Sequence, residues 1–451
     1  MPSIPKKQSL TTSVYDILNA IRNNATTNYQ DFIPPATDKN SLRQIGAIMM
    51  QYQALQNEFL SALVNRIGRV IISSKQYENP WASFKRGYLE YGETTEEIFT
   101  NIAKPFQYDP EVAENKVFKR VIPDVRSAFH TMNYQKFYKV TVTQEQLRQA
   151  FLSEDGVSSL IADIVQSLYT AANYDEFQVM KYLLFRNILN SRLYPVTVDT
   201  VNTANMKSII ADVKSMSNKL EFMSDKYNVA GVKTHAKKSE QYILIDADFQ
   251  AKMDVEVLAS AFNMSKAEFM GHLVLIDGFG ELDNERLAEL FEGDETYVPI
   301  TDAELSALAE IPLVLVSENY FMIFDNLNQF TEQYNGEGLY WNYWYHQWKT
   351  FSVSPFAVAL MFIPATPTVT SVSVSPDTAS IGVGENLSLT PTVEVTNFAP
   401  KTVVYTSSDE DVATVSNAGV VTGISAGSST ITVTSTFDDT KSDTASITVT
   451  A

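Results

Sequence analysis

A pattern with catalytic spacing lies near the C-terminus, where GISAG from Gly423 to Gly427 matches the G-x-S-x-G of a nucleophile elbow. That chemistry needs a strand-to-helix turn beneath the serine and a histidine later in the chain. Short strand-like runs flank the motif, and every histidine precedes it (His130, His235, His272 and His346). We therefore interpret GISAG as a turn between strands and predict no catalytic residue.

Acidic residues suggest a second chemistry, the binding of a cation. Asp246 and Asp248 follow one strand-like run and Asp277 follows another, and carboxylates are ligands for hard cations. Aspartate is also common where strands end in turns, and we favour that interpretation. The chain has no cysteine, which excludes thiolate sites. It also lacks phosphate-binding loops and H-E-x-x-H, so we predict no metal and no cofactor.

The segment 281–310 holds ten acidic residues and one basic residue, Arg286. We interpret it as a solvated surface excursion, with a cation or a basic partner as the alternative. Across the whole chain the net charge is −19. Because DNA binding through counterion release needs clustered lysine and arginine, this charge argues against a DNA-coating surface.

Basic residues occur as isolated pairs, too sparse to form a nucleic-acid groove. In an assembly, such pairs could meet acidic residues of a neighbouring copy. Isolated surface ion pairs contribute little each, but repetition over many copies multiplies them. We therefore predict intersubunit contacts among Lys85, Arg86, Glu93, Glu96, Glu97, Lys119 and Arg120.

Three of the four tryptophans lie in GLYWNYWYHQWKTFSV, at 338–353. Alternation along a strand places Trp341, Tyr343 and Tyr345 on one face. The other face receives Tyr340, Trp344, His346 and Trp348. Rings on both faces predict a strand that is buried on both sides, so we interpret the cluster as core rather than as a sugar platform or a cation cage.

Helices and strands must position these residues. The longest predicted helix runs from Val157 to Leu189 and is on the order of 50 Å long at ~1.5 Å per residue. Its apolar stripe is interrupted at Glu176. YILIDADF and HLVLIDGF predict buried strands, and capping boxes at Ser265 and Thr301 predict short helices. Residues 77–144 predict a hairpin that needs a neighbouring surface to be stable. After 363, PATPTVT is a linker, and short strands with turns predict an immunoglobulin-like sandwich.

The end of the chain resembles the bacterial Ig-like domain, group 2, through SSDEDVATVSNAGVVTGISAGSSTITV, with Tyr405 where that family usually carries tryptophan. The body resembles the major capsid proteins of phi 29-type short-tailed phages from about Tyr15 to Phe362. The motifs that carry this resemblance are YDILNAIRN, YGETTEEIFTNI, IDADFQAKMDVEVLASAFNM, LVLIDGF and GLYWNYWYHQWKTFSVSPFA.

The resemblance implies an α+β fold of the Hong Kong 97 type with an all-β Ig-like sandwich at its end. The expected parts are an N-terminal arm (1–75), an extended β-hairpin loop (76–150), a spine helix and peripheral domain (151–204), an A-domain (205–345), a returning peripheral strand (346–364), a linker (365–369) and the Ig-like domain (370–451).

It also implies a structural protein whose copies form pentamers and hexamers in an icosahedral or prolate virion shell, where the Ig-like domain decorates or clamps the surface. Expected partners are a scaffolding protein, a portal at one vertex, double-stranded DNA by enclosure, and the host surface through the Ig-like domain. We see no signal peptide, and the longest apolar run, FAVALMFI, is too short to span a membrane, so assembly in the host cytoplasm is expected. The alternative is a bacterial adhesin.

Overall fold

The structure is a computed structural model that describes residues 77–89, 94–106, 121–143, 156–256, 272–338 and 340–451, with parts of 19–37 and single positions at 41, 44, 45, 48 and 55. The capping box predicted at Ser265 lies outside these residues. The chain forms two compact units. The first comprises Met1–Gln76, Tyr138–Thr170 and Phe330–Tyr345, and the second comprises Tyr77–Phe137, Ala171–Gln329 and His346–Ala451.

A five-stranded mixed sheet in the order β5-β11-β8-β6-β7 organises the second unit. Strand β11 pairs parallel with β5 and antiparallel with β8, and β6 pairs antiparallel with β8 and parallel with β7. The sheet contains both predicted strands, YILID and LVLI. Its strands are β5 (Tyr194–Thr197), β6 (Gln241–Asp246), β7 (Leu273–Ile276), β8 (Leu313–Ser317) and β11 (Ala359–Ile363).

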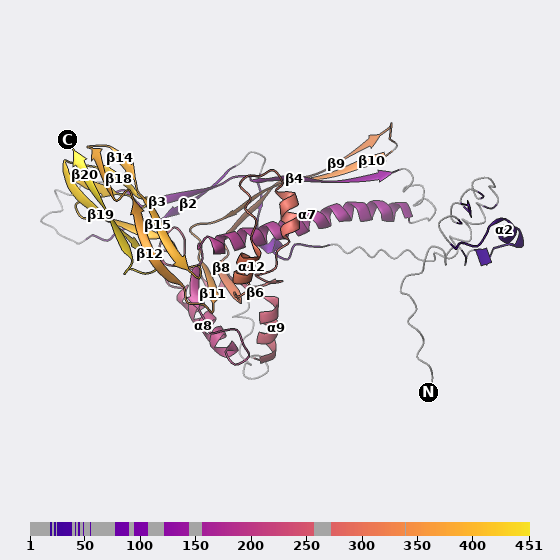
Figure 1. Ribbon diagram of the computed structural model, residues 1–451, viewed down its shortest axis with the longest axis horizontal. Coiled ribbons are helices and arrows are strands. Elements are labelled where there is room, and N and C mark those ends of the chain that lie inside the picture. Colours follow the sequence, from indigo (N-terminus) through magenta and orange to yellow (C-terminus); the bar gives the residue numbers. More distant parts are fainter. Residues whose placement is uncertain are drawn as a thin grey trace. The chain divides into compact units, whose positions relative to one another are not determined.

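Helices cover both faces of this sheet, and residue parity along each strand decides which face a side chain joins. In β8, Val314 and Val316 join a core with helix α7 (Gly156–Leu189), whereas Leu313 and Leu315 join a core with α8 (Met206–Lys219) and α9 (Ala247–Glu256). Figure 1 shows α8 and α9 near strands β6 and β11. The strands lack polar alternation because both of their faces are buried. Helix α7 has the predicted span to within one residue.

A second sheet has the order β1-β9-β10-β4, and a separate hairpin pairs β2 with β3. Strand β1 follows a short 3-10 helix, η1 (Ala82–Phe84), and pairs parallel with β9. The strands are β1 (Lys85–Tyr88), β2 (Thr95–Thr100), β3 (Val125–His130), β4 (Tyr134–Thr143), β9 (Phe321–Asn335) and β10 (Tyr340–Val353). Among the described strands, the predicted hairpin region is thus split, because β1 and β4 join late strands whereas β2 and β3 pair with each other.

The acidic segment 281–310 forms two short helices, α11 (Asn284–Leu290) and α12 (Asp302–Leu308). The capping box predicted at Thr301 is present, since its side chain accepts a hydrogen bond from the Glu304 backbone and the Glu304 carboxylate accepts one from the Thr301 backbone. Most of the acidic side chains are exposed. The interpretation as a surface excursion is nevertheless wrong for the apolar residues, because Leu287, Ile300 and Leu308 are at most 1 % exposed in the core against α7.

In the first unit, the aromatic strand β10 is less buried than predicted. Tyr345 is buried, but Tyr340, Tyr343 and Trp344 are only partly buried. Tyr343 stacks on Phe330, and the Lys139 amine lies 5.6 Å from the Trp344 ring centroid. The prediction of a strand buried on both sides is therefore wrong for these three rings. Toward the N-terminus, helix α2 (Thr27–Phe32) is capped by the Thr26 hydroxyl.

The C-terminal strands form the expected Ig-like sandwich (Figure 1), with sheets β13-β20-β19-β16, β14-β18-β17 and β12-β15. GISAG connects β18 to β19 as a turn, and Tyr405 packs half-buried against the sandwich core. The strands are β12 (Thr368–Ser375), β13 (Thr378–Gly382), β14 (Asn386–Ser388), β15 (Thr390–Thr396), β16 (Val403–Ser407), β17 (Ala413–Val415), β18 (Val420–Gly423), β19 (Gly427–Ser435) and β20 (Ser442–Thr450). Among the described helices, none has the length and hydropathy needed to cross a bilayer.

Candidate functional site

The β2–β3 hairpin has one face that is anchored to the end of β10 and the segment that follows it. His130 is 2 % exposed. Its Nδ1 lies 2.8 Å from the Ser352 hydroxyl, and its Nε2 lies 3.3 Å from the Glu97 carboxylate. The Ser354 hydroxyl donates to the other Glu97 oxygen at 2.8 Å. Phe99, on the same face, stacks on Phe356 at 5.5 Å between ring centroids. This face is therefore held by both hydrogen bonds and packing.

The opposite face of the hairpin is apolar and exposed. The antiparallel register sets Thr100 opposite Val125, Ile98 opposite Ser127 and Glu96 opposite Phe129. Parity directs all six side chains away from the anchored face. Ile98 is 61 % exposed, Val125 52 % and Phe129 65 %. The flanking segments carry further exposed apolar side chains, Ile102, Phe106, Val121 and Ile122, each more than half exposed. We name these seven residues the hairpin surface; an exposed apolar patch of this kind marks an interaction site.

At the start of β1, four charged side chains from four elements meet in the interior. The Glu176 carboxylate of α7 ion-pairs with Lys349 of β10 and lies 3.2 Å from the Lys85 amine. Asp325 of β9 lies 2.6 Å from the Lys85 amine and 3.3 Å from that of Lys349. The Asn79 amide donates to Glu176 at 2.6 Å. Two positive and two negative charges therefore compensate one another where little water reaches them.

Burial lowers the pKa of Lys349 well below its usual range, and the neighbouring Lys85 charge acts in the same direction. The two acids oppose this shift by attracting a protonated amine. This balance fixes β1, α7, β9 and β10 against one another. We interpret it as a structural arrangement, because its charges pair with one another and the neighbouring Phe84 and Phe177 belong to the buried core. The sequence feature that pointed to this charge cluster is the interruption of the apolar stripe of α7 at Glu176.

The residues predicted to make intersubunit contacts have different environments. Lys85 contacts acids of its own chain, as described above, and the Arg86 guanidinium donates to Glu318 O at 2.9 Å and to the Asn319 side chain. Glu96 is exposed on the hairpin face that carries the apolar residues, whereas Glu97 belongs to the anchored face. Glu93, Lys119 and Arg120 lie outside the described residues. An intersubunit role for the seven stays a prediction.

Two of the three acids considered for cation binding, Asp246 and Asp277, have partners within the chain. The Asp246 carboxylate accepts a hydrogen bond from the Phe249 backbone at the start of α9. Both oxygens of Asp277 lie 2.9 Å from the Lys181 amine, which also donates to the Glu281 carbonyl. Within the described part of the chain, no cluster of three or more potential ligands could hold a metal. The interpretation as strand-end aspartates agrees with these contacts.

Two sequence families match the chain. The family described as Phi29-like phage major capsid protein matches residues 18–363, and the bacterial Ig-like domain (group 2) matches residues 368–449. The major capsid protein of Bacillus phage B103 is 37 % identical over 95 % of this chain and 90 % of its own length. That of Bacillus phage PZA is 35 % identical over 87 % of this chain and 83 % of its own length. These matches favour the capsid prediction over the adhesin alternative.

The fold has solved counterparts. A chain from the capsid structure of Staphylococcus phage Andhra superposes with a TM-score of 0.53 at 14 % identity, covering 66 % of this chain and 88 % of that one. At this identity the likeness concerns the fold alone. It supports the predicted capsid fold of the Hong Kong 97 type, with the Ig-like sandwich as an addition at the C-terminus.

Proposed function

Because the chain belongs to the Phi29-like phage major capsid protein family, whose members are structural and non-enzymatic, we propose that its copies associate as pentamers and hexamers into a closed icosahedral or prolate shell around double-stranded DNA. A closed shell requires heterologous contacts, in which one surface of a copy meets a different surface of the next. The hairpin surface is the feature that supports this proposal best. Its apolar side chains face outward, while the opposite face of the same hairpin is fixed to its own subunit.

The role of the hairpin surface is tested by placing charges on it. Ile98→Glu with Phe129→Glu would put carboxylates into an apolar contact, and the cost of desolvating them opposes assembly. The control is Val404→Glu, an exposed apolar position of the Ig-like domain. Each variant is expressed together with the phage's scaffolding protein, and closed particles are counted by electron microscopy. We expect the control to assemble and the double variant to remain as free, folded subunits. Normal particles from the double variant would exclude the hairpin surface as a contact.

The remaining partners follow from the same proposal. A scaffolding protein guides assembly in the host cytoplasm, a portal occupies one vertex, and DNA is enclosed without sequence-specific binding. The net charge of −19 supports enclosure without tight binding, because the shell has few clustered cations to release counterions from DNA. Nuclease-treated particles at increasing salt provide the measurement. After the shells are opened, the salt concentration at which the DNA dissociates is recorded. If the DNA stays bound up to salt concentrations that disrupt weak non-specific complexes, enclosure without tight binding is wrong.

We propose that the Ig-like domain decorates or clamps the outside of the shell. One contact supports a position against its own subunit: the Tyr194 and Phe437 rings lie 5.7 Å apart. The Asn397 amide also donates to the Thr366 carbonyl of the linker, at 2.7 Å. A chain that ends after Ile363 would show which role applies. Clamping predicts shells that open at lower temperature than wild-type shells, and decoration alone predicts equal stability but altered adsorption to host cells.

A further inference from the structure

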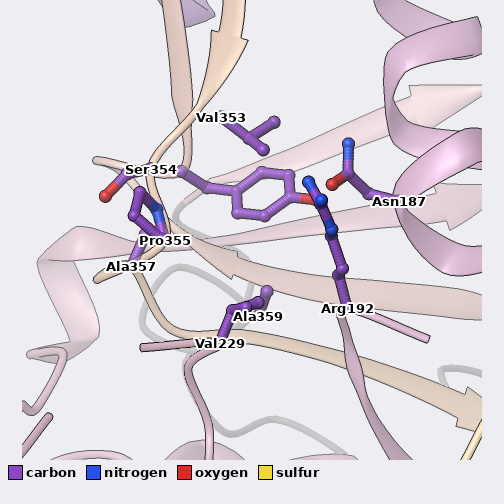
Figure 2. Close-up of a pocket in the computed structure, with 9 residues that line it drawn as sticks. Asn187, Arg192, Val229, Val353, Ser354, Pro355, Ala357 and Ala359 are labelled. Carbon is purple, nitrogen blue, oxygen red and sulfur yellow. The ribbon is translucent and has the colours of Figure 1, made fainter. Parts of the chain in front are cut away.

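A small cavity lies where the end of α7, the β8–β9 turn and the β10–β11 connection come together. Its volume is about 50 Å³. Figure 2 shows Asn187 and Arg192 reaching in from one side, with Ser354 and Pro355 on the opposite side. The side chains of Val229, Val353, Ala357 and Ala359 complete an aliphatic wall, and Tyr320 supplies the only aromatic ring among the described residues of the lining.

Two polar atoms that border this cavity are buried and lack a hydrogen-bond partner within the described residues. They are the Tyr320 hydroxyl and the Asn187 side-chain oxygen. Tyr320 is 3 % exposed and Asn187 is 5 % exposed. A buried polar group without a partner costs roughly 1–3 kcal/mol. Two such atoms on one cavity are therefore expected to be satisfied by a molecule bound in it, either water or another ligand.

The hydrogen bonds and charges around the cavity determine which of its polar groups can donate a hydrogen bond and which can accept one. The Asn187 amide nitrogen donates to the Leu183 carbonyl at 2.7 Å, which fixes its oxygen as the atom that requires a donor. Burial raises the pKa of Tyr320, so its hydroxyl stays protonated and can donate. Arg192 is exposed, and its positive charge lies close enough to oppose the rise in the pKa of Tyr320. Its guanidinium can only donate hydrogen bonds. No ion pair or hydrogen bond of that guanidinium occurs among the described residues. The Ser354 hydroxyl is already engaged with Glu97.

We propose that this cavity binds a neutral group that carries a hydrogen-bond acceptor and a donor together, of the size of a primary carboxamide. The carbonyl accepts from Tyr320 or Arg192, the amino group donates to the Asn187 oxygen, and the aliphatic wall packs against the attached carbon. A carboxylate satisfies the donors but sets negative oxygens against the Asn187 oxygen. A guanidinium or ammonium group satisfies Asn187 but meets the positive charge of Arg192.

Two sources share this chemistry. One is free solution, from which water or a small amide enters. The other is the side chain of an asparagine or glutamine of a second copy, which reaches the cavity in the assembled shell. The second source rests on the proposed function, whereas binding by the isolated chain does not. An experiment on both forms of the protein therefore separates a failure of this inference from a failure of the assembly proposal.

Acetamide and acetate form a matched pair of probes, because they have the same shape and differ in the donor group and the charge. Binding of each to the free full-length chain is measured by saturation-transfer NMR. We expect acetamide to bind and acetate not to bind. Tyr320→Phe removes the hydroxyl and keeps the ring, so it is expected to weaken acetamide binding roughly three- to tenfold, the range for one neutral hydrogen bond. Arg192→Gln, at the exposed rim, serves as a second variant that leaves the interior intact.

The thermal midpoint of Tyr320→Phe gives an independent result. If a ligand or water satisfies the hydroxyl, the variant unfolds at a lower temperature than wild type. If the cavity is empty, removal of an unsatisfied hydroxyl raises the midpoint, and this result would overturn the inference. Preferential binding of acetate would overturn it as well. In assembled shells, loss of acetamide binding would identify a side chain of the second copy as the occupant, and retained binding would identify solution as the source.

Discussion

Glu176 of α7 and Lys349 of β10 form an ion pair although 173 positions separate them in the chain, and both side chains are at most 2 % exposed. The pair is compensated by Lys85 and Asp325. Taking charges out of water is expensive, so such a cluster contributes less to stability than its contacts suggest. We expect its main consequence to be specificity, because α7, β1, β9 and β10 must meet at one register for all four charges to be paired.

Removal of one charge from this cluster is expected to destabilise the subunit. Glu176→Gln keeps the side-chain volume but leaves the buried Lys349 and the partly buried Lys85 with one acid, at a cost of about 3 kcal/mol in the free energy of unfolding. Urea denaturation of the free chain measures it. Glu289→Gln removes the exposed partner of an i,i+3 pair and serves as the control; we expect a change below about 0.5 kcal/mol. Equal losses in the two variants would show that the cluster is not buried as described.

The only basic residue of the segment 281–310 has a similar role. Arg286 of α11 makes a two-bond ion pair with Asp175 of α7, at 2.8 and 2.9 Å, and Asp175 is completely buried. Arg286→Met would leave that carboxylate uncompensated and cost about 3 kcal/mol. The stability of Arg286→Lys is expected to lie between those of wild type and Arg286→Met, because an ammonium cannot form both bonds in the same plane. A lysine variant as stable as wild type in urea denaturation would contradict this account.

Alkaline pH is expected to destabilise the subunit partly through Tyr174. Burial, together with its hydrogen bond to the Asp283 carboxylate at 2.8 Å, raises its pKa to about 12. In the unfolded chain the pKa is near 10. Between pH 10 and pH 12 the unfolded chain releases the Tyr174 proton before the folded chain does. The stabilisation of the folded subunit by the protonated hydroxyl is therefore complete below pH 10 and is lost as pH rises through 12. The stability of Tyr174→Phe should fall less steeply in this window. Parallel pH profiles of the two proteins would refute it.

The Ig-like domain is expected to unfold separately from the capsid body, because its core residues form their own cluster. Ile431→Ala removes a completely buried side chain and is expected to cost about 3 kcal/mol in that domain alone. Calorimetry should show the domain's transition at lower temperature and the body's transition unchanged. Ile424→Ala, at a 47 % exposed position in the adjoining turn, should move neither. A joint shift of both transitions would mean that the two parts unfold as one.

The sequence by itself was sufficient to predict the caps, turns, helices and strands that depend on residues close together in the chain. The Thr301 capping box and the turn at GISAG involve residues within four positions of one another, and the apolar stripe of α7 repeats along one helix. The buried strands of the central sheet were likewise predicted from their apolar runs. Propensity and periodicity act over such short distances, so one sequence is sufficient to reveal them. The resemblance to capsid proteins added the order of the parts.

The tertiary structure decided what depends on distant partners. Arg286 and Asp175 are 111 positions apart, and nothing local distinguishes this arginine from a solvated one. The partner of Lys85 within its own chain is distant as well, because β1 lies beside β9, which supplies Asp325. The aromatic rings of β10 were predicted to be core, but their burial depends on which neighbours cover the sheet. Strand order and the side of the sheet that a helix covers determine these contacts, and both are set only when the whole chain folds.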